Sequence, residues 1–190
     1  HSVSESIKFT KQCLQQIVDE KCPLEKLIIS KSLRGFYKNP DSIAHKVLAD
    51  RITKRDPGNK PAVGSRIPYI YIQTKGKVKL QGDKIEDPDF IRKNKIKPDY
   101  SFYITNQIMK PVQQIYGLLL YDIPQFKRKV RMFKKKIAKL EKEYRNDAKK
   151  FKDKSEKIIY AEVKKIIFQE YLLASDRIKT GQKSLLSMFG

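Results

Sequence analysis

The sequence is 190 residues long and holds 42 lysine and arginine residues against 21 acidic residues, a formal net charge of +21 at pH 7. Hydrophobic residues make up 39% of it and the mean hydropathy is −0.60, which fits a soluble protein with a modest core and argues against membrane and wholly disordered proteins. The longest apolar run, near 115–123, is shorter than the roughly 20 residues that a membrane-spanning helix needs, and we expect no membrane partner. So basic a chain is typical of proteins that bind a polyanion, above all nucleic acid.

Cysteine and histidine are too few and too scattered to form a zinc site of the usual spacing. The chain has Cys13, Cys22, His1 and His45, and we interpret both cysteines as reduced thiols of a cytosolic or nuclear protein. The sequence begins with His1 instead of methionine and has no signal-like start, which predicts a fragment of a longer polypeptide.

The first half of the chain alternates helical and extended patterns. In chain order it predicts a helix at 9–19, a buried strand at 24–30, a basic turn at 31–35 and a helix at 41–54. Asp41 or Ser42 is the expected N-cap of the last of these helices, because Asp and Ser side chains accept hydrogen bonds from the free N–H groups of a first turn.

A loop is predicted at 56–65, where two prolines and two glycines interrupt any regular pattern. An alternating strand at 66–73 and a second short strand at 78–80 should follow, and then a helix at 99–116 that Pro111 kinks or splits in two. Three acidic residues lie between the strand predicted at 78–80 and the helix predicted at 99–116, and we interpret them as part of a solvated loop: Glu86, Asp87 and Asp89.

After Pro124 the composition becomes more basic, with 20 basic and 8 acidic residues in 126–190. Apolar residues spaced by three and four predict a long helix at 126–151 and a second helix at 155–174, which could form an antiparallel hairpin. The fold class is therefore mainly α with a small β element (α+β). The apolar seam of the first helix leaves open a coiled-coil assembly protein as the weakest functional alternative.

The candidate binding residues are basic side chains close to tyrosines, because Lys and Arg contact phosphates and release counterions without reading any base. The residues singled out on this ground are Lys31, Arg34, Lys54, Arg55, Lys60, Arg66 and Tyr69. The sequence contains no phosphate-binding glycine loop, nucleophile elbow or metal-binding histidine pair, and we assign no catalytic and no metal-binding residue to this chain.

Three blocks of sequence carry a resemblance to a known family. KLIISKS at 26–32, ADRITKRDPGNKPAVGSRIPYIY at 49–71 and DYSFYITNQIMKPVQQI at 99–115 occur in the order and at the intervals typical of family B, delta-like DNA polymerases. The resemblance implies the end of the palm at 1–35 and the thumb, which grips the primer-template duplex across its minor groove, at 36–124. A basic helical hairpin at 125–175 and a flexible tail at 176–190 complete the expected domains.

The same resemblance implies roles for individual residues. Lys54 to Gly58 and Gly64 to Arg66 correspond to motifs of the form RDPG and GxR at the base of the thumb. There Gly64 would let the backbone approach a phosphate, Arg66 would bind that phosphate, and Asp56 would hold the loop. The aspartates that bind two Mg²⁺ ions in this family belong to motifs that are not in this chain. We therefore expect the chain to bind no cofactor and not to polymerise alone, with Mg²⁺ bound elsewhere in the intact polymerase.

The last residues resemble a peptide that binds a PCNA-type sliding clamp. Its anchor positions would be Gln182, Leu185, Met188 and Phe189. A frayed hydrophobic terminus is the alternative.

Similar tails occur in polymerases of large nucleocytoplasmic DNA viruses, which implies action in a cytoplasmic viral factory or in the nucleus of an infected cell. The sequence thus predicts the C-terminal fragment of a replicative polymerase. The alternative from another class is a freestanding basic helical nucleic-acid-binding protein without catalysis.

Overall fold

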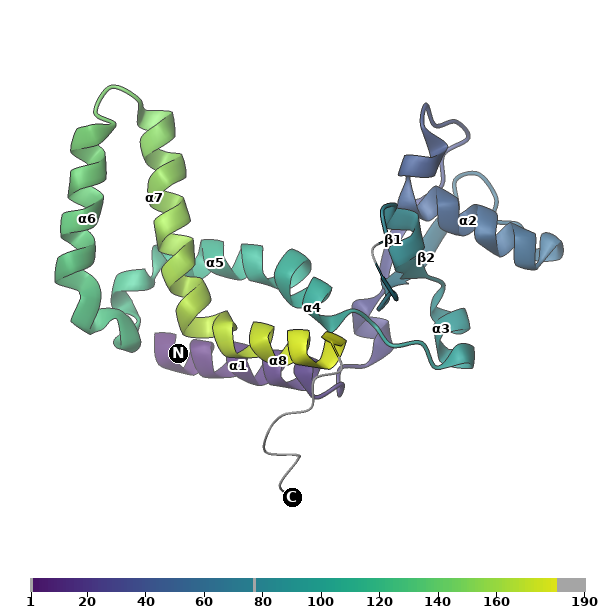
Figure 1. Cartoon of the computed structure of the whole chain (residues 1–190), viewed down its shortest axis with the longest axis horizontal. Helices are drawn as coiled ribbons and strands as arrows, with labels where there is room; N and C mark the ends of the chain where they lie inside the picture. Colours follow the sequence, from purple (N-terminus) through teal and green to yellow (C-terminus); the bar gives the residue numbers. More distant parts are fainter. Residues whose placement is uncertain (1, 77, 181–190) are drawn as a thin grey trace, which may run out of the picture. The chain divides into compact units, whose positions relative to one another are not determined.

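The computed structural model describes residues 2–76 and 78–180, which form two compact units (Figure 1). Lys21–Tyr103 make up the first, here called the sheet unit, and the residues up to Glu20 together with those from Ile104 onward make up the second, here called the helical unit. The expected class, mainly α with a small β element, is confirmed. The palm, thumb, hairpin and tail boundaries stay predictions. None of the helices in the described ranges is both long enough and apolar enough to cross a bilayer.

A three-stranded antiparallel sheet lies at the centre of the sheet unit. The strands β1 (Ile29–Ser32), β2 (Arg66–Tyr71) and β3 (Ile85–Glu86) follow one another in the order β1-β2-β3. Ser32 is paired with Arg66 at one end of the β1–β2 ladder. The middle strand has the highest density of β-branched and aromatic residues, which favour a half-buried pleated surface.

Short helices surround this sheet: α2 (Ala44–Arg55), α3 (Pro88–Asn94) and α4 (Tyr100–Phe102), with 3-10 turns at Leu24–Leu27, Pro40–Ser42, Pro57–Asn59 and Gln81–Lys84. One face of the sheet packs on α2 through a core of Leu33, Leu48, Ala49, Ile67, Tyr69 and Ile85. Gly82 allows the 3-10 turn to approach α2, because a Cβ at this position would lie 2.6 Å from Cβ of Val47.

The structure corrects several expected boundaries in the sheet unit. The strand predicted at 24–30 begins at Ile29 and continues through Ser32 into the expected turn, because those residues pair with β2. Neither Asp41 nor Ser42 caps α2, whose N-cap is Ile43; the Ser42 hydroxyl instead donates to the Asn39 carbonyl. Of the described residues, those at 78–80 form no strand, and the edge partner of β2 is β3.

The helical unit contains the long helices α1 (Val3–Val18), α5 (Met109–Leu118), α6 (Val130–Glu143), α7 (Ala148–Val163) and α8 (Gln169–Thr180). Two π-helical segments, Tyr103–Ile108 and Lys164–Phe168, precede α5 and connect α7 to α8. Two 3-10 segments, Leu120–Asp122 and Pro124–Lys129, connect α5 to α6. Pro111 lies in the first turn of α5, where its missing N–H removes little hydrogen bonding.

Specific polar contacts join these helices. The Tyr116 hydroxyl on α5 lies 2.6 Å from Oγ of Ser6 and 3.0 Å from Oγ1 of Thr10, both on α1. The Gln113 side chain donates to the Tyr160 carbonyl at 2.9 Å. Gly117 allows α5 to pack closely on α7, since a Cβ there would lie 3.0 Å from Ile159.

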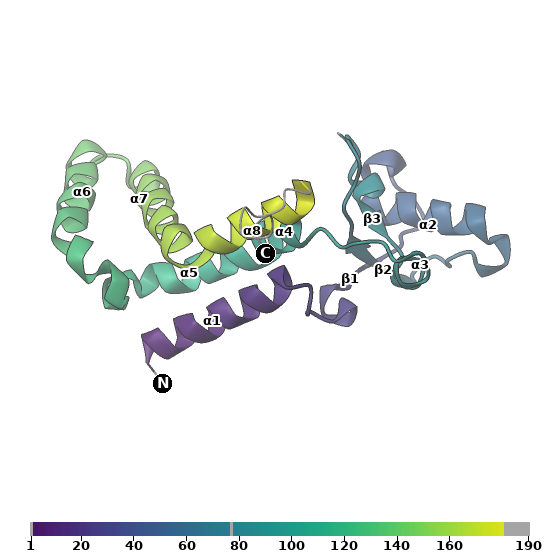
Figure 2. The ribbon, with the colours of Figure 1, turned by 60° about the horizontal axis from the view of Figure 1, so that its bottom comes forward.

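The predicted basic hairpin is present, but its turn lies earlier than expected (Figures 1 and 2). The helix predicted at 126–151 ends at Glu143, and the second helix begins at Ala148 instead of near 155. Asp147 caps α7 by accepting a hydrogen bond from the Lys150 N–H at 2.9 Å, which stabilises a helix start at this position.

Candidate nucleic-acid interface

The ladder between β1 and β2 extends past the strand ends and brings two loops together. The Leu33 N–H donates to the Ser65 carbonyl at 2.8 Å, and the Gly64 N–H donates to the Leu33 carbonyl at 2.7 Å. The segment 31–38 and the segment 60–66, which are about thirty residues apart in sequence, therefore lie side by side at this edge of the sheet unit. We call them the paired loops.

Four of the predicted DNA-binding residues lie in the paired loops and are exposed: Lys31, Arg34, Lys60 and Arg66. The Arg66 guanidinium is held in place by β1, because Nε donates to Oγ of Ser30 at 3.0 Å and Nη2 donates to the Ser30 carbonyl at 3.2 Å. Such contacts restrict the side chain of Arg66, which is exposed, so that less entropy would be lost if its guanidinium bound an anion.

Gly64 occupies a backbone conformation that favours glycine. Its φ is +87°, and no atom outside Gly64 and its two chain neighbours lies within 4 Å of the position where a Cβ would stand. A side chain here would cost about 1–2 kcal/mol in backbone strain and would also cover the open side of the loop. The predicted close approach of a ligand to this backbone therefore has room.

A tyrosine and a histidine order the first of the paired loops. The Tyr37 hydroxyl accepts the Arg34 N–H at 2.7 Å and lies 3.0 Å from Nε2 of His45. Burial lowers the pKa of His45 most, and the charges of Lys31 and Arg34 lower it further, against an opposing hydrogen bond with the backbone of Ser32. The pKa of His45 therefore lies below its usual value chiefly because the ring is partly buried.

Asp56 holds the turn that leads from α2 to the second of the paired loops. Its carboxylate accepts hydrogen bonds from the Gly58 N–H at 3.2 Å and from the side-chain amide of Asn59. This arrangement caps the Pro57–Asn59 turn that follows α2.

The remaining predicted residues are placed differently. Lys54 is exposed on the last turn of α2, but Arg55 binds the Glu86 carboxylate at 2.6 Å and its guanidinium lies 3.7 Å from the centre of the Phe90 ring. Tyr69 is only 6% exposed and belongs to the core of the sheet unit, since inward-facing positions alternate along β2. Its ring is thus not on the surface, where a DNA contact would require it.

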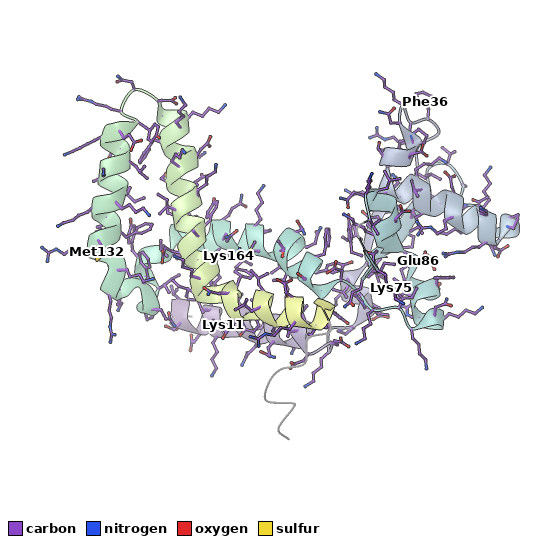
Figure 3. All side chains as sticks on the ribbon, viewed as in Figure 1. Lys11, Phe36, Lys75, Glu86, Met132 and Lys164 are labelled. Carbon is purple, nitrogen blue, oxygen red and sulfur yellow. The ribbon has the colours of Figure 1, made fainter. Side chains whose placement is uncertain are left out.

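The expectation of a solvated acidic loop is wrong for Glu86, which is 3% exposed (Figure 3). Besides Arg55, its carboxylate faces Arg51, whose Nη1 lies 3.5 Å from Oε1 and also donates to the Ile85 carbonyl at 3.0 Å. Asp87 caps α3 and the exposed Asp89 pairs with Arg92. The acidic cluster is therefore an anchor between α2 and β3 and a helix cap.

Sequence reasoning missed Arg51 and Phe36. Arg51 binds groups more than thirty residues away, so no local pattern could have found it. Phe36 lies in a turn between Arg34 and Lys38 and belongs to no apolar stripe. Its position in the sequence could therefore have indicated an exposed apolar side chain. The predicted clamp-binding residues Gln182, Leu185, Met188 and Phe189 lie outside the described residues.

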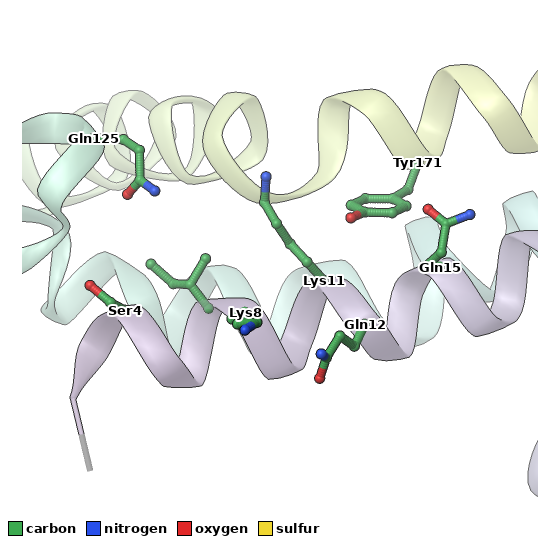
Figure 4. Close-up of a pocket in the computed structure, with 8 residues that line it drawn as sticks. Ser4, Lys8, Lys11, Gln12, Gln15, Gln125 and Tyr171 are labelled. Atoms are coloured by element: carbon green, nitrogen blue, oxygen red, sulfur yellow. The ribbon is translucent and has the colours of Figure 1, made fainter.

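A pocket of about 380 Å³ on the helical unit lies between α1 and Tyr171 of α8, with Lys8, Lys11 and Gln15 among its lining residues (Figure 4). Lys11 forms an ion pair with Glu170 at 2.9 Å. Within 2–76 and 78–180, no three His, Cys, Asp or Glu side chains come close enough to hold a metal ion.

Comparison with known proteins supplies the family. The family model for DNA polymerase family B matches residues 1–119. The DNA polymerase of Pyramimonas orientalis virus is 40% identical over 190 residues, which cover 99% of this chain and 16% of that polymerase. The DNA polymerase of Acanthamoeba polyphaga mimivirus is 44% identical over 134 residues, covering 67% of this chain and 8% of the relative. The DNA polymerase delta catalytic subunit of Caenorhabditis elegans is 35% identical over 118 residues, which cover 62% of this chain and 11% of that subunit.

The chain thus spans less than a fifth of the length of each of these relatives. Its similarity to the Pyramimonas orientalis virus polymerase continues through the basic hairpin, beyond the region that the family model matches. The expected resemblance to viral and delta-like polymerases is confirmed. From the family model and from these identities together, the chain belongs to DNA polymerase family B.

Proposed function

We propose that this chain is the segment of a replicative DNA polymerase that holds primer-template duplex DNA, with the paired loops as its principal contact. The rest of the polymerase would supply the residues that bind Mg²⁺ and carry out nucleotide addition. The partners would then be the duplex and the other polymerase domains, in a viral factory or in the nucleus of an infected cell.

The observation that carries this proposal is the convergence of exposed cations at the paired loops. The backbone hydrogen bonds between Leu33 and the segment Gly64–Ser65 place Lys31 and Arg34 next to Arg66, and all three side chains are exposed. Phosphates are the groups that such a surface binds, and phosphate contacts hold a duplex of any sequence. Holding any sequence is what a replicative polymerase requires.

A measurement of duplex binding against salt concentration tests the proposal. Each phosphate neutralised by a cation contributes about 0.9 to the slope of log affinity against log salt, so replacing Arg34 and Arg66 of the paired loops together by alanine should lower that slope by about 2. Affinity should fall equally for duplexes of unrelated sequence. Lys93→Ala, an exposed lysine on α3, is the matched control and should change neither quantity. Unchanged binding by the double variant would refute the assignment of the site.

The sequence of the tail supports a second proposal, binding to a sliding clamp. Phe189 would supply an aromatic anchor for an apolar pocket on the clamp, and Gln182 would bind a polar notch. Phe189→Ala should abolish binding to a PCNA-type sliding clamp from the same source as the chain in surface plasmon resonance. Ser184→Ala, between the anchors, should leave binding intact. A wild-type chain that fails to bind this clamp would end the proposal.

A further inference from the structure

One side of α6 carries a row of cations, here called the α6 row: Arg131, Lys135, Lys139 and Lys142. They follow one another at spacings of four, four and three residues, which places all of them on one side of a helix with 3.6 residues per turn. All four side chains are exposed, whereas Phe133, the buried residue of α6, lies on the opposite side. At a rise of 1.5 Å per residue, the row is about 17 Å long.

The protein does not compensate the charge of the α6 row. Within residues 2–76 and 78–180, no ion pair joins any of its four cations to an acidic side chain, although the two glutamates of α6 lie at its edges. The lysines of the neighbouring helix α7 differ. Lys150 pairs with Asp147 at 3.2 Å, and Lys152 pairs with Glu156 at 4.0 Å. The uncompensated charge is therefore a property of one face of the hairpin and not of the whole hairpin.

The contacts of α6 hold this face in place. Phe126 is completely buried at the start of the helix, and the Phe133 ring lies edge to face on it with the ring centres 5.0 Å apart. The Lys129 ammonium donates to the Glu162 carboxylate on α7 at 3.1 Å. A partner of the α6 row would thus bind a preformed surface and would not have to order its backbone.

The composition of the face selects the kind of partner. Protein interfaces and helices that bind membrane surfaces have an apolar centre, but here only Ala138 lies between the cations and Met132 lies at the edge. A hydrated polyanion needs no apolar centre, because cations bind its phosphates by charge. The chain belongs to DNA polymerase family B, so the polyanion that such a protein meets is duplex DNA.

We propose that the α6 row is a second contact with duplex DNA, made to phosphates of any sequence and separate from the paired loops. It lies beyond residues 1–119, which the family model matches. Two separate contacts must break together before the duplex leaves, so the α6 row slows dissociation. This inference rests on the proposed function in one respect, namely that the chain binds duplex DNA.

Two quadruple alanine variants of the 190-residue chain test the contact. The first replaces the four cations of the α6 row. It should lower the slope of log affinity against log salt by about 3–4 and raise the dissociation rate of the duplex, with unchanged helicity in circular dichroism. The control removes the same charge from the other helix of the hairpin and should change the slope by less than about 1. Its substitutions are at four exposed lysines of α7: Lys149, Lys150, Lys152 and Lys154.

The outcomes separate this contact from the paired loops. Equal decreases in the two quadruple variants would show that net charge sets binding, and would refute the contact. It is also refuted, while the proposed function stands, if the α6 variant binds like the wild type and the Arg34 and Arg66 double variant does not. Loss in the α6 variant alone supports the contact and removes the paired loops as the site. A chain that binds no duplex refutes both.

Polyglutamate as a competitor distinguishes DNA from an acidic protein segment. We expect it to displace labelled duplex from the wild-type chain far less effectively than unlabelled duplex of equal charge does, because its charges are not arranged as a duplex arranges its phosphates. Equal displacement by the two competitors would assign the α6 row to an acidic protein and overturn the proposal.

Discussion

Replacing Glu86 by glutamine is expected to lower the free energy of unfolding by about 2–4 kcal/mol. The substitution removes the buried carboxylate and leaves the guanidinium groups of Arg51 and Arg55 without their anionic partner. In the native structure the Glu86 carboxylate accepts from Arg55 at 2.6 Å and also accepts the Asp87 N–H at 2.9 Å. A glutamine amide can keep one of these interactions but turns an N–H donor toward a guanidinium. Urea unfolding monitored by circular dichroism would measure the loss.

Asp83→Asn is the matched control for this experiment. Asp83 also faces Arg51, at 3.4 Å, but its side chain is half exposed, so water replaces the lost interaction and we expect a change below about 1 kcal/mol. Equal effects of the two substitutions would show that burial of Glu86 does not set its contribution. Because Glu86 joins β3 to α2, whose last turn carries Lys54, the Glu86 variant should also bind duplex more weakly.

The second large effect is expected in the helical unit, where Phe126→Ala should destabilise the protein by about 3–5 kcal/mol. Phe126 is completely buried and lies edge to face on Phe133, with the ring centres 5.0 Å apart. Truncation would leave a cavity below the start of α6, because fixed neighbouring helices cannot collapse into it fully. Thermal unfolding followed by circular dichroism would detect this as a lower midpoint.

Met132→Ala provides the comparison for Phe126→Ala. Met132 lies on α6 one residue before Phe133 but is exposed, so its removal should cost no more than about 0.5 kcal/mol. A small effect of Phe126→Ala would mean that the hairpin does not depend on this aromatic cluster. A large effect of Met132→Ala would mean that its exposed side chain is covered in solution.

Local patterns predicted the helices well where an apolar stripe continues without interruption. The stripe of Leu14, Ile17 and Val18 is buried on α1, and Val163 and Ile167 are buried as the second hairpin helix requires. The sequence predicts the hairpin turn too late, because the apolar spacing runs on past Glu143, whereas the start of α7 depends on the local contacts of Asp147, which accepts the Lys150 N–H. Element type thus follows from repeated burial, whereas element ends follow from one or two contacts.

The candidate site was likewise predictable in part from the sequence and in part only from contacts between distant segments. Lys31, Arg34 and Arg66 could be proposed from the sequence, because clustered cations and a glycine-containing loop are visible in the chain itself. Arg55 and Tyr69 look equivalent to them in sequence, yet one is bound by Glu86 and the other is in the core. Nothing local distinguishes an arginine that faces solvent from one that meets a carboxylate thirty-one residues away.

The sequence by itself determined that the protein is basic, mainly helical and built on family B polymerase motifs, since composition, apolar spacing and ordered motifs are properties of the chain alone. Only the tertiary structure decided which cations share a surface, that Glu86 is an anchor and that Phe36 stands exposed among charges. These properties depend on contacts between distant segments, and the free energy of such a contact is set by burial and geometry that no short window of sequence contains.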